Sequence, residues 1–577
     1  MSVRRAEPLS GPWYAPIVNH LGVTGTYLAL GNRSEYQDGS RHRFTLVGDY
    51  FVTQPVVGTP DGTPRGLRSF MPSWLSTAGQ APGAFNLRPT SFRFTSGLAR
   101  DDERRASFLK PADAPDDPGL VAIGETNLWR NTGSLELQPM AHLTARADLV
   151  VTRDLRNYDP TTPNGGAADA ERGTFLGMDA GIERERQLAS SITYAPEIAG
   201  WLRPRVDFAS SFSLTRDPNS PLVFPTSLTP TPPPDTIRRE LAVRLGNTRT
   251  ITLGTGIDVA KAGAKYAGPS SLAGRLAQYI QPIDVSATRG LLSSYDAASE
   301  SPGLGYQLGI GTINGFRELN GGLANSAGES SQIAVTSGLN LPAAITFTNR
   351  VQRTTTTNWA RRLESDQTTI DGDQTVFPDL NVRWSPRGPL FGGVVKAASF
   401  NGRFLHTRQS LVVPAVVIGA EPERRATRVQ AFPLNASLTW PGDLTTTAGY
   451  SYRTQVDSLP GSVTNGNAAE TSAEVGRPFR LPADWGFKSG LRTRLGFQQS
   501  HTKSYVENLF AALNRSRLTD NGRQAITLNA DTDVAENATF SIQGARIVNF
   551  DRNLNRRVTQ TVITAVVQMQ FYAGDLR

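Results

Sequence analysis

The stretch that decides the fold is RVTQTVITAVVQMQF, residues 557–571, where apolar side chains recur at every second position. The apolar row consists of Ile563, Ala565, Val567, Met569 and Phe571, and the residues between them include Thr564, Gln568 and Gln570. A period of two gives a strand with one apolar face and one largely polar face. About 9 to 11 residues of tilted strand cross a bilayer, and Phe571 and Tyr572 stand where an interfacial aromatic belt is expected. The stretch therefore predicts a membrane-spanning β-strand.

The same alternation recurs earlier in the chain. In 143–152 the apolar row is Leu143, Ala145, Ala147, Leu149 and Val151, and it alternates with Thr144, Arg146, Asp148 and Thr152. An unpaired arginine on a lipid-facing surface near the membrane midplane costs roughly 2 to 4 kcal/mol, so the face with Arg146 and Asp148 is expected to meet water. Segments 43–52 and 205–214 follow the same pattern, with Arg205 and Asp207 on the polar side of the second.

Further segments with strand patterning fill the rest of the sequence. They are 241–259, with a hairpin turn expected at Asn247-Thr-Arg249, and 304–312, 333–341, 345–351, 380–384, 398–405, 429–440, 444–452, 485–497, 526–534 and 538–547. With the earlier ones they make on the order of twenty strands separated by turn-rich sequence, which is typical of an all-β antiparallel protein. We therefore predict an all-β fold: a large antiparallel transmembrane β-barrel, or an incomplete arc of a very large barrel, with long loops.

The domain prediction treats residues 1–577 as a single outer-membrane β-barrel region. Long loops are expected near 55–84, 100–127, 217–236, 261–281, 354–374 and 502–522. Short links such as 441–443 and 535–537 alternate with the long ones, as in barrels with short periplasmic turns and long outer loops. Segment 261–281 is the best helix candidate, because Leu272, Leu276 and Ile280 recur at intervals of four. We interpret it as a packed loop helix, with a membrane-active helix as the alternative.

Composition excludes several classes of site. The 577 residues contain no cysteine, so neither a disulfide framework nor a thiolate metal site can form. The net charge of +8 comes from arginines spread singly along the chain and not gathered into a basic stripe, so no nucleic-acid partner is expected. No run of 18 apolar residues exists, which excludes a membrane-spanning helix. Metal-ligand spacing is absent among the five histidines, His20, His42, His142, His406 and His501.

No motif indicates catalysis, so we predict no catalytic, cofactor-binding or metal residue, no cofactor and no enzyme activity. Gly303-Leu-Gly-Tyr-Gln-Leu-Gly309 superficially resembles a nucleotide-binding fingerprint, but we interpret its glycines as strand residues that relieve crowding. Asp371-Gly-Asp373 supplies too few oxygens for calcium, which takes six to eight, and is interpreted as a solvated loop turn. The first residues show no apolar secretory segment, so we expect this chain to be part of a longer exported protein.

Several phrases resemble the SprA family, also called Sov, the giant outer-membrane proteins of type 9 secretion and gliding motility. They are Trp201-Leu-Arg-Pro-Arg205 with Arg216-Asp-Pro-Asn219, Pro302-Gly-Leu-Gly-Tyr-Gln-Leu-Gly309, Phe377-Pro-Asp-Leu380 leading to Trp384, and the terminal 561–571 strand followed by Tyr572-Ala-Gly-Asp575. Members of that family are much longer, so the chain would correspond to a C-terminal part. The largest known barrels have about 36 strands, and roughly twenty strands would form an open arc.

The resemblance implies a protein-conducting channel at the bacterial outer membrane and cell surface. Its expected partners are membrane lipid, secreted cargo proteins, and periplasmic and surface proteins of the secretion machinery. Two alternatives stay open. One is a non-transporting outer-membrane barrel or surface adhesin, and the other is a soluble secreted β-rich carbohydrate-binding protein or enzyme. Apolar rows that face each other across a dry sandwich would favour the soluble alternative.

Overall fold

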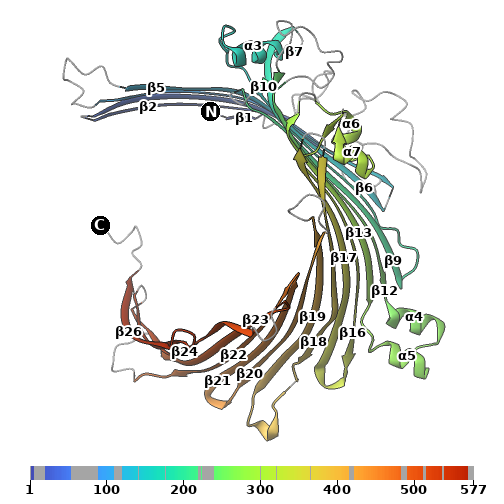
Figure 1. Cartoon of the computed structure of the whole chain (residues 1–577), viewed down its shortest axis with the longest axis vertical. Coiled ribbons are helices and arrows are strands. Elements are labelled where there is room, and N and C mark those ends of the chain that lie inside the picture. The colour runs from blue at the N-terminus through green and yellow to red at the C-terminus, as the bar shows by residue number, and fades with distance from the viewer. Residues whose placement is uncertain are drawn as a thin grey trace.

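The computed structural model describes residues 2–4, 20–34, 36–53, 89–108, 120–140, 142–175, 177–218, 222–223, 240–298, 301–319, 321–363, 366–386, 388–414, 422–482, 490–510, 515–535 and 538–569. One antiparallel sheet of 22 strands dominates these residues. The sheet curves into an open arc, with the N-terminal strands at one free edge and the C-terminal strands at the other (Figure 1).

The elements follow the chain in this order: β1 (Ser2–Arg4), β2 (Leu21–Ser34), β3 (Gln37–Thr53), β4 (Pro89–Ser107), β5 (Leu120–Met140), β6 (Leu143–Asp154), α3 (Pro163–Ala170), β7 (Gly173–Phe175), β8 (Met178–Tyr194), β9 (Leu202–Arg216), β10 (Leu222–Val223), β11 (Glu240–Leu241), β12 (Val243–Ile257), α4 (Val259–Tyr266), α5 (Leu272–Ala277), β13 (Ile283–Ala298), α6 (Leu304–Gln307), α7 (Ile313–Arg317), β14 (Glu318–Leu319), β15 (Gly322–Leu323), β16 (Ser326–Leu341), β17 (Ile345–Leu363), β18 (Asp366–Trp384), β19 (Ala397–Val413), β20 (Glu423–Thr439), β21 (Thr445–Leu459), β22 (Ser462–Phe479), β23 (Leu491–Asn508), β24 (Arg515–Ala535), β25 (Ala538–Asp551) and β26 (Arg556–Met569).

The main sheet is a meander in which successive long strands pair. The segments that separate some of these long strands are not part of the meander, because β6 pairs with β8, β9 with β12, and β13 with β16. Within the described residues, β26 pairs only with β25, and the outer edge of β2 pairs only with β1, over the three residues Ser2–Arg4. No described ladder joins the two edges, so this sheet is an arc and not a closed barrel.

The register sorts side chains onto two faces. One cross-strand row in β18–β21 is Val382, Gly402, Leu434 and Tyr450, and the adjoining row is Arg383, Asn401, Asn435 and Gly449. Because successive side chains of a strand point to opposite faces, these rows lie on opposite surfaces. The alternation predicted from sequence is therefore carried across neighbouring strands as one apolar and one polar surface.

A cluster of packed side chains identifies the apolar surface as the convex one. Phe212, Leu214 and Leu245 are buried against Tyr306 of α6. The Tyr295 hydroxyl donates to the carbonyl of Phe316, 2.9 Å away, in α7. In Figure 1, α6 and α7 lie outside the arc, on its convex side. The face carrying Phe212 is thus convex, and the polar face lines the inside of the arc.

The structure corrects the strand predicted at 304–312. This segment forms α6 and the link that leads to α7 instead, and Tyr306 of α6 and Phe316 of α7 are buried. The glycines of 303–309 are therefore not strand residues, and Gly309 adopts a positive φ of 69° that ends the helical turn. The reason is tertiary packing: Tyr306 completes the cluster around Phe212, which a strand at this position would leave uncovered.

The hairpin predicted at 241–259 was also wrong. Residues Val243–Ile257 form one strand, β12, whose backbone pairs on one side with β9 and on the other with β13 through Asn247 and Arg249. Both polar side chains find partners in the α6 segment. Asn247 donates to the carbonyl of Tyr306, and Arg249 donates to the carbonyls of Gly309 and Gly311 at 3.2 and 2.6 Å. These contacts allow polar residues in a strand where the sequence indicated a turn.

Three long loops expected from sequence are largely strands. In 100–127, β4 continues to Ser107 and β5 begins at Leu120; in 354–374, β17 and β18 are separated only by 364–365; in 502–522, β23 ends at Asn508 and β24 begins at Arg515. These parts have polar residues on both faces and so lack apolar alternation. Cross-strand pairs such as Arg353 with Asp373, 2.6 Å apart, join them instead.

Segment 261–281 is helical, but α4 and α5 are two short helices and not one. Leu272 and Leu276 are exposed on α5, which departs from the packed helix we predicted. Loop 55–84, most of 217–236, residues 485–489, and Phe571 and Tyr572 lie outside the described residues. No helix in the described part of the chain is both long and apolar enough to cross a lipid bilayer.

We predict that the Tyr306 phenol titrates near pH 12. Burial raises the pKa of Tyr306 to about 12, while the ordinary value is about 10. The folded protein holds the phenol proton more tightly than the unfolded chain does. Packing of Tyr306 therefore stabilises the fold fully below a pH of about 10, and this stabilisation is lost as the pH rises through about 12. The tyrosinate absorbance of wild type and of Tyr306→Phe is measured as a function of pH, and the difference between the two curves reports Tyr306 alone. A difference curve centred near the ordinary tyrosine pKa would contradict the packing.

Candidate functional site: the polar concave wall

The convex surface carries an apolar band near one end of the sheet. We call the end with turns 342–344 and 441–443 the base, and the end with the turn 460–461 and the pair Leu363–Asp366 the rim. Along β17 the outward row reads Ile345, Phe347, Asn349 and Val351 from the base, then Arg353, Thr355 and Thr357 toward the rim. Along β20 it reads Leu438, Ala436, Leu434 and Phe432, then Gln430 and Arg428. Both strands turn polar after about eight residues, roughly 25 Å of strand, the height of a lipid-facing band.

Large apolar side chains in this band are exposed. Ile333, Leu253 and Leu528 have relative exposures of 56%, 53% and 50% on three separate strands. Soluble monomers rarely expose apolar patches beyond a few hundred Å². At the base, the indoles of Trp384 and Trp440 donate to the Ala343 carbonyl and the Thr446 hydroxyl at 3.1 and 2.9 Å, as expected of interfacial tryptophans.

An apolar surface of this height fits the hydrocarbon layer of a bilayer. Strands can cross such a layer only when their backbone groups are bonded within a sheet, and membrane sheets of this kind are the β-barrels of outer membranes. The fold is therefore that of an outer-membrane β-barrel wall, and the protein belongs to the bacterial outer membrane. The dry sandwich that would have supported the soluble alternative is not seen, since the described apolar rows lie on one convex face.

The concave wall is the candidate functional surface, and several of its charges are paired between or along strands. Arg146 contacts Asp148 at 2.8 Å and Arg205 contacts Asp207 at 2.6 Å, on the polar side that the alternation predicted for both pairs. Arg403 binds Asp379 through two hydrogen bonds of 2.6 and 2.8 Å. Threonine, serine and asparagine side chains fill the positions between these pairs.

These ion pairs contribute little to stability. Pairs exposed to water are worth about 0 to 1 kcal/mol, and the arginines of Arg146–Asp148 and Arg205–Asp207 are about 60% exposed. Their effect is instead on the charge and hydration of the concave surface. Where an arginine and a carboxylate pair, their charges cancel, and together with the hydroxyl groups they leave a hydrated surface.

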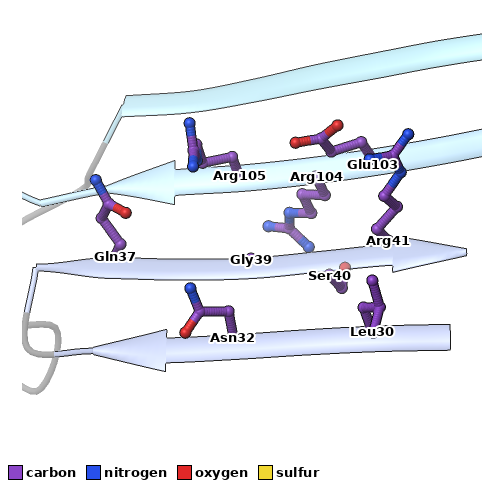
Figure 2. A pocket seen from close by; sticks show the side chains of 9 residues that line it. All are labelled: Leu30, Asn32, Gln37, Gly39, Ser40, Arg41, Glu103, Arg104 and Arg105. Carbon is purple, nitrogen blue, oxygen red and sulfur yellow. The ribbon is translucent and has the colours of Figure 1, made fainter. Parts of the chain in front are cut away.

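A small pocket lies on the concave face near the rim of β2–β4. It has a volume of about 110 Å³, and Figure 2 shows Gln37, Arg41, Glu103 and Arg105 pointing to the same side. Gly39 pairs with Arg105, and its missing side chain leaves the space between them. Arg41 is held by two hydrogen bonds to Asp101, at 2.9 and 2.5 Å. The pocket is a charged recess of the rim with room for a few water molecules.

The sequence predicted no site residue, and the structure shows why the wall was missed. Which arginine meets which carboxylate depends on register, as for Arg403 and Asp379 on neighbouring strands. Asp371 and Asp373 are strand residues of β18 and not a loop turn, with Asp371 accepting from Thr357 at 2.8 Å. Among the described residues, no group of three or more metal-ligating side chains is gathered.

Comparisons with known proteins add little to this geometry. No family model and no curated protein matches the sequence. Among solved structures, the siderophore receptor PirA from Pseudomonas aeruginosa has a TM-score of 0.29 and 10% identity, covering 95% of this chain and 80% of the receptor. PirA from Acinetobacter baumannii has a TM-score of 0.24 and 10% identity, with coverages of 96% and 80%. The ferric enterobactin receptor of P. aeruginosa has a TM-score of 0.24 and 9% identity, with coverages of 91% and 74%. Scores this low say nothing about what this chain binds.

We predict opposite accessibility for two neighbouring residues of β20. The chain has no native cysteine, so Leu434→Cys on the convex face and Asn435→Cys on the concave face each introduce a single thiol. In intact bilayers a membrane-impermeant maleimide should label Asn435→Cys at least about ten-fold faster, because transfer of a polar reagent into hydrocarbon costs more than ~1.4 kcal/mol. After denaturation the two rates should converge, and equal rates in the bilayer would contradict the assignment of faces.

Proposed function

We propose that the chain forms part of the wall of an outer-membrane protein-conducting channel of the type 9 secretion kind, linked to gliding motility. The observation that carries this proposal is an arc of some twenty long strands that is apolar outside and polar inside, and that no ladder between described residues closes. Known barrels reach about 36 strands. An arc of this breadth is suited to a pore wider than those that pass small solutes.

The free edges support a larger assembly. A strand edge leaves a row of backbone N–H and C=O groups without partners, and in hydrocarbon each such group costs several kcal/mol. Exposed apolar side chains such as Ile563 and Val567 place the β26 edge in the lipid band. We expect further strands to pair with β26 and with the part of β2 that β1 leaves open, which fits a chain whose sequence resembles the C-terminal part of a longer translocon.

The position of the helices outside the sheet supports transport through the arc. Tyr306 of α6 packs on Phe212 of the convex face and its ring contacts that of Phe316 in α7, while α3 packs on Ile182 of β8. In Figure 1 these helices lie outside the arc, so the described helices leave the polar wall uncovered. A surface adhesin would need no such uncovered polar wall along the full height of the strands.

The orientation follows from the band and the chain ends. Met569 pairs with Ala538, and Leu21 pairs with Tyr50. These pairs show that β26 ends at the base and that β2 begins there. The strands extend well past the band toward the rim, as outer-membrane barrels do on the extracellular side. Cargo would enter at the base from the periplasm and leave at the rim, with periplasmic and surface partners supplying direction.

Site-directed cross-linking tests the proposal. A photoactivatable cross-linker attached at Asn435→Cys should form adducts with several different exported proteins in secreting cells, because this side chain faces the conduit. The same reagent at Leu434→Cys should give lipid adducts only. Deletion of the gene should abolish release of many cargo proteins. Loss of attachment or movement with normal secretion, and no adducts at Asn435→Cys, would overturn the proposal in favour of an adhesin.

A further inference from the structure

The convex band is hollowed at one place, over β18–β22. The hollow has a volume of about 670 Å³ and an almost wholly apolar lining. Its floor is formed by Gly402, Ala436, Ala448 and Ala473, and its walls by larger side chains including Trp384, Phe400, Leu434 and Tyr450. We call this the β19 groove. Its volume is within the range of specific ligand sites, roughly 300 to 1,000 Å³.

Two features make the β19 groove a built site and not a random gap. Trp384 and Phe400 are stacked, with ring centroids 5.1 Å apart and planes at 19°, and the Trp384 indole is fixed by its bond to Ala343. Gly402 lies opposite Leu434, and a Cβ at Gly402 would come within 2.9 Å of a Leu434 methyl group. The missing side chain leaves room for this methyl group, and the groove lies between a rigid aromatic wall and Leu434.

Two cations stand at its base end. Beyond the last ladder pair, Lys396 and Arg477 approach the turn 441–443 from either side. Lys396 Nζ lies 3.3 Å from Asp443, and the Arg477 guanidinium would contact a Cβ placed on Gly442 at 3.7 Å. Arg477 lies over the Phe479 ring at 5.1 Å and has no carboxylate partner among the described residues. The three charges sum to one positive charge at the level of the lipid headgroups.

We propose that the β19 groove binds one anionic phospholipid of the periplasmic leaflet. An acyl chain occupies the groove beside Gly402, and the phosphate lies between Lys396 and Arg477. The leaflet follows from position, because the groove begins at Trp384 at the base and its cations lie at the same end. Continuity with the lipid-facing band selects a bilayer lipid as the occupant, and the positive charge selects an anionic headgroup. This inference rests on the membrane placement of the proposed function.

Binding at this site would have a mechanical consequence. The groove spans five consecutive strands, β18 to β22, in the middle of the C-terminal half of the arc. In an occupied groove, side chains from all five strands would contact the same acyl chain. These shared contacts would hold the five strands together on their convex side. An open arc has no closure to fix its curvature, so the bound lipid would stiffen this part of the wall.

Native mass spectrometry of the full chain in detergent, titrated with palmitoyl-oleoyl phosphatidylglycerol, tests the proposal. Wild type should retain one lipid above the background of weak adducts. Gly402→Phe should lose that lipid, because the new ring fills the groove. The matched control is Gly133→Phe, on the same convex face with no atom within 4 Å of the added Cβ, and it should retain the lipid.

Charge variants test the headgroup. Lys396→Gln with Arg477→Gln should weaken phosphatidylglycerol binding at least about ten-fold, because both charge-assisted contacts to the phosphate are lost. The double variant should also lose the preference for phosphatidylglycerol over phosphatidylcholine. Lys265→Gln with Arg275→Gln removes the same charge from α4 and α5 and should change nothing. Equal lipid retention in Gly402→Phe and wild type, or equal loss in both glycine variants, overturns the site. Rapid labelling of Leu434→Cys in bilayers would instead overturn the membrane placement itself.

Discussion

The structure depends on the requirement that every backbone polar group in hydrocarbon has a hydrogen-bond partner. A sheet meets this requirement between strands and leaves alternate side chains free to face lipid or water. That is why a chain of negative mean hydropathy, −0.31, can present a continuous apolar surface. The same requirement makes the edges at β26 and β2 the places where this arc is incomplete, because the outer side of β26 has no described partner and that of β2 has one only over Ser2–Arg4.

The two surfaces of the sheet divide its tasks. The convex band places the protein in the bilayer, and the concave wall offers hydroxyl groups and neutralised ion pairs to whatever lies inside the arc. Near the rim the division changes, since both faces meet water and strands such as β17 and β18 are joined through Arg353 and Asp373. There α6 covers part of the convex face in place of lipid. Phe212 and Leu214 continue an apolar row of the sheet and are buried under this helix.

The β19 groove and the Arg249 site show two ways of handling an irregular convex surface. At Arg249 a polar side chain on the lipid-facing row is made acceptable by carbonyls of the α6 segment, so protein supplies the partner. Over Gly402 the convex face is hollowed by the apolar β19 groove, and close packing within hydrocarbon favours an acyl chain as its filling. In both cases the neighbour that completes the surface comes from outside the strand itself.

The sequence by itself determined the all-β class, the approximate number of strands, and the faces of segments such as 143–152 and 205–214, because a period of two is a local property that each strand carries alone. It could not determine that Leu304–Gln307 is helical, that Val243–Ile257 is one strand, or that β17 and β18 pair within 354–374. Those outcomes depend on contacts between distant residues, such as Tyr306 with Phe212 and Arg353 with Asp373. The ion pairs of the wall and the groove at Gly402 likewise arise from the register between strands, which only the tertiary structure decided.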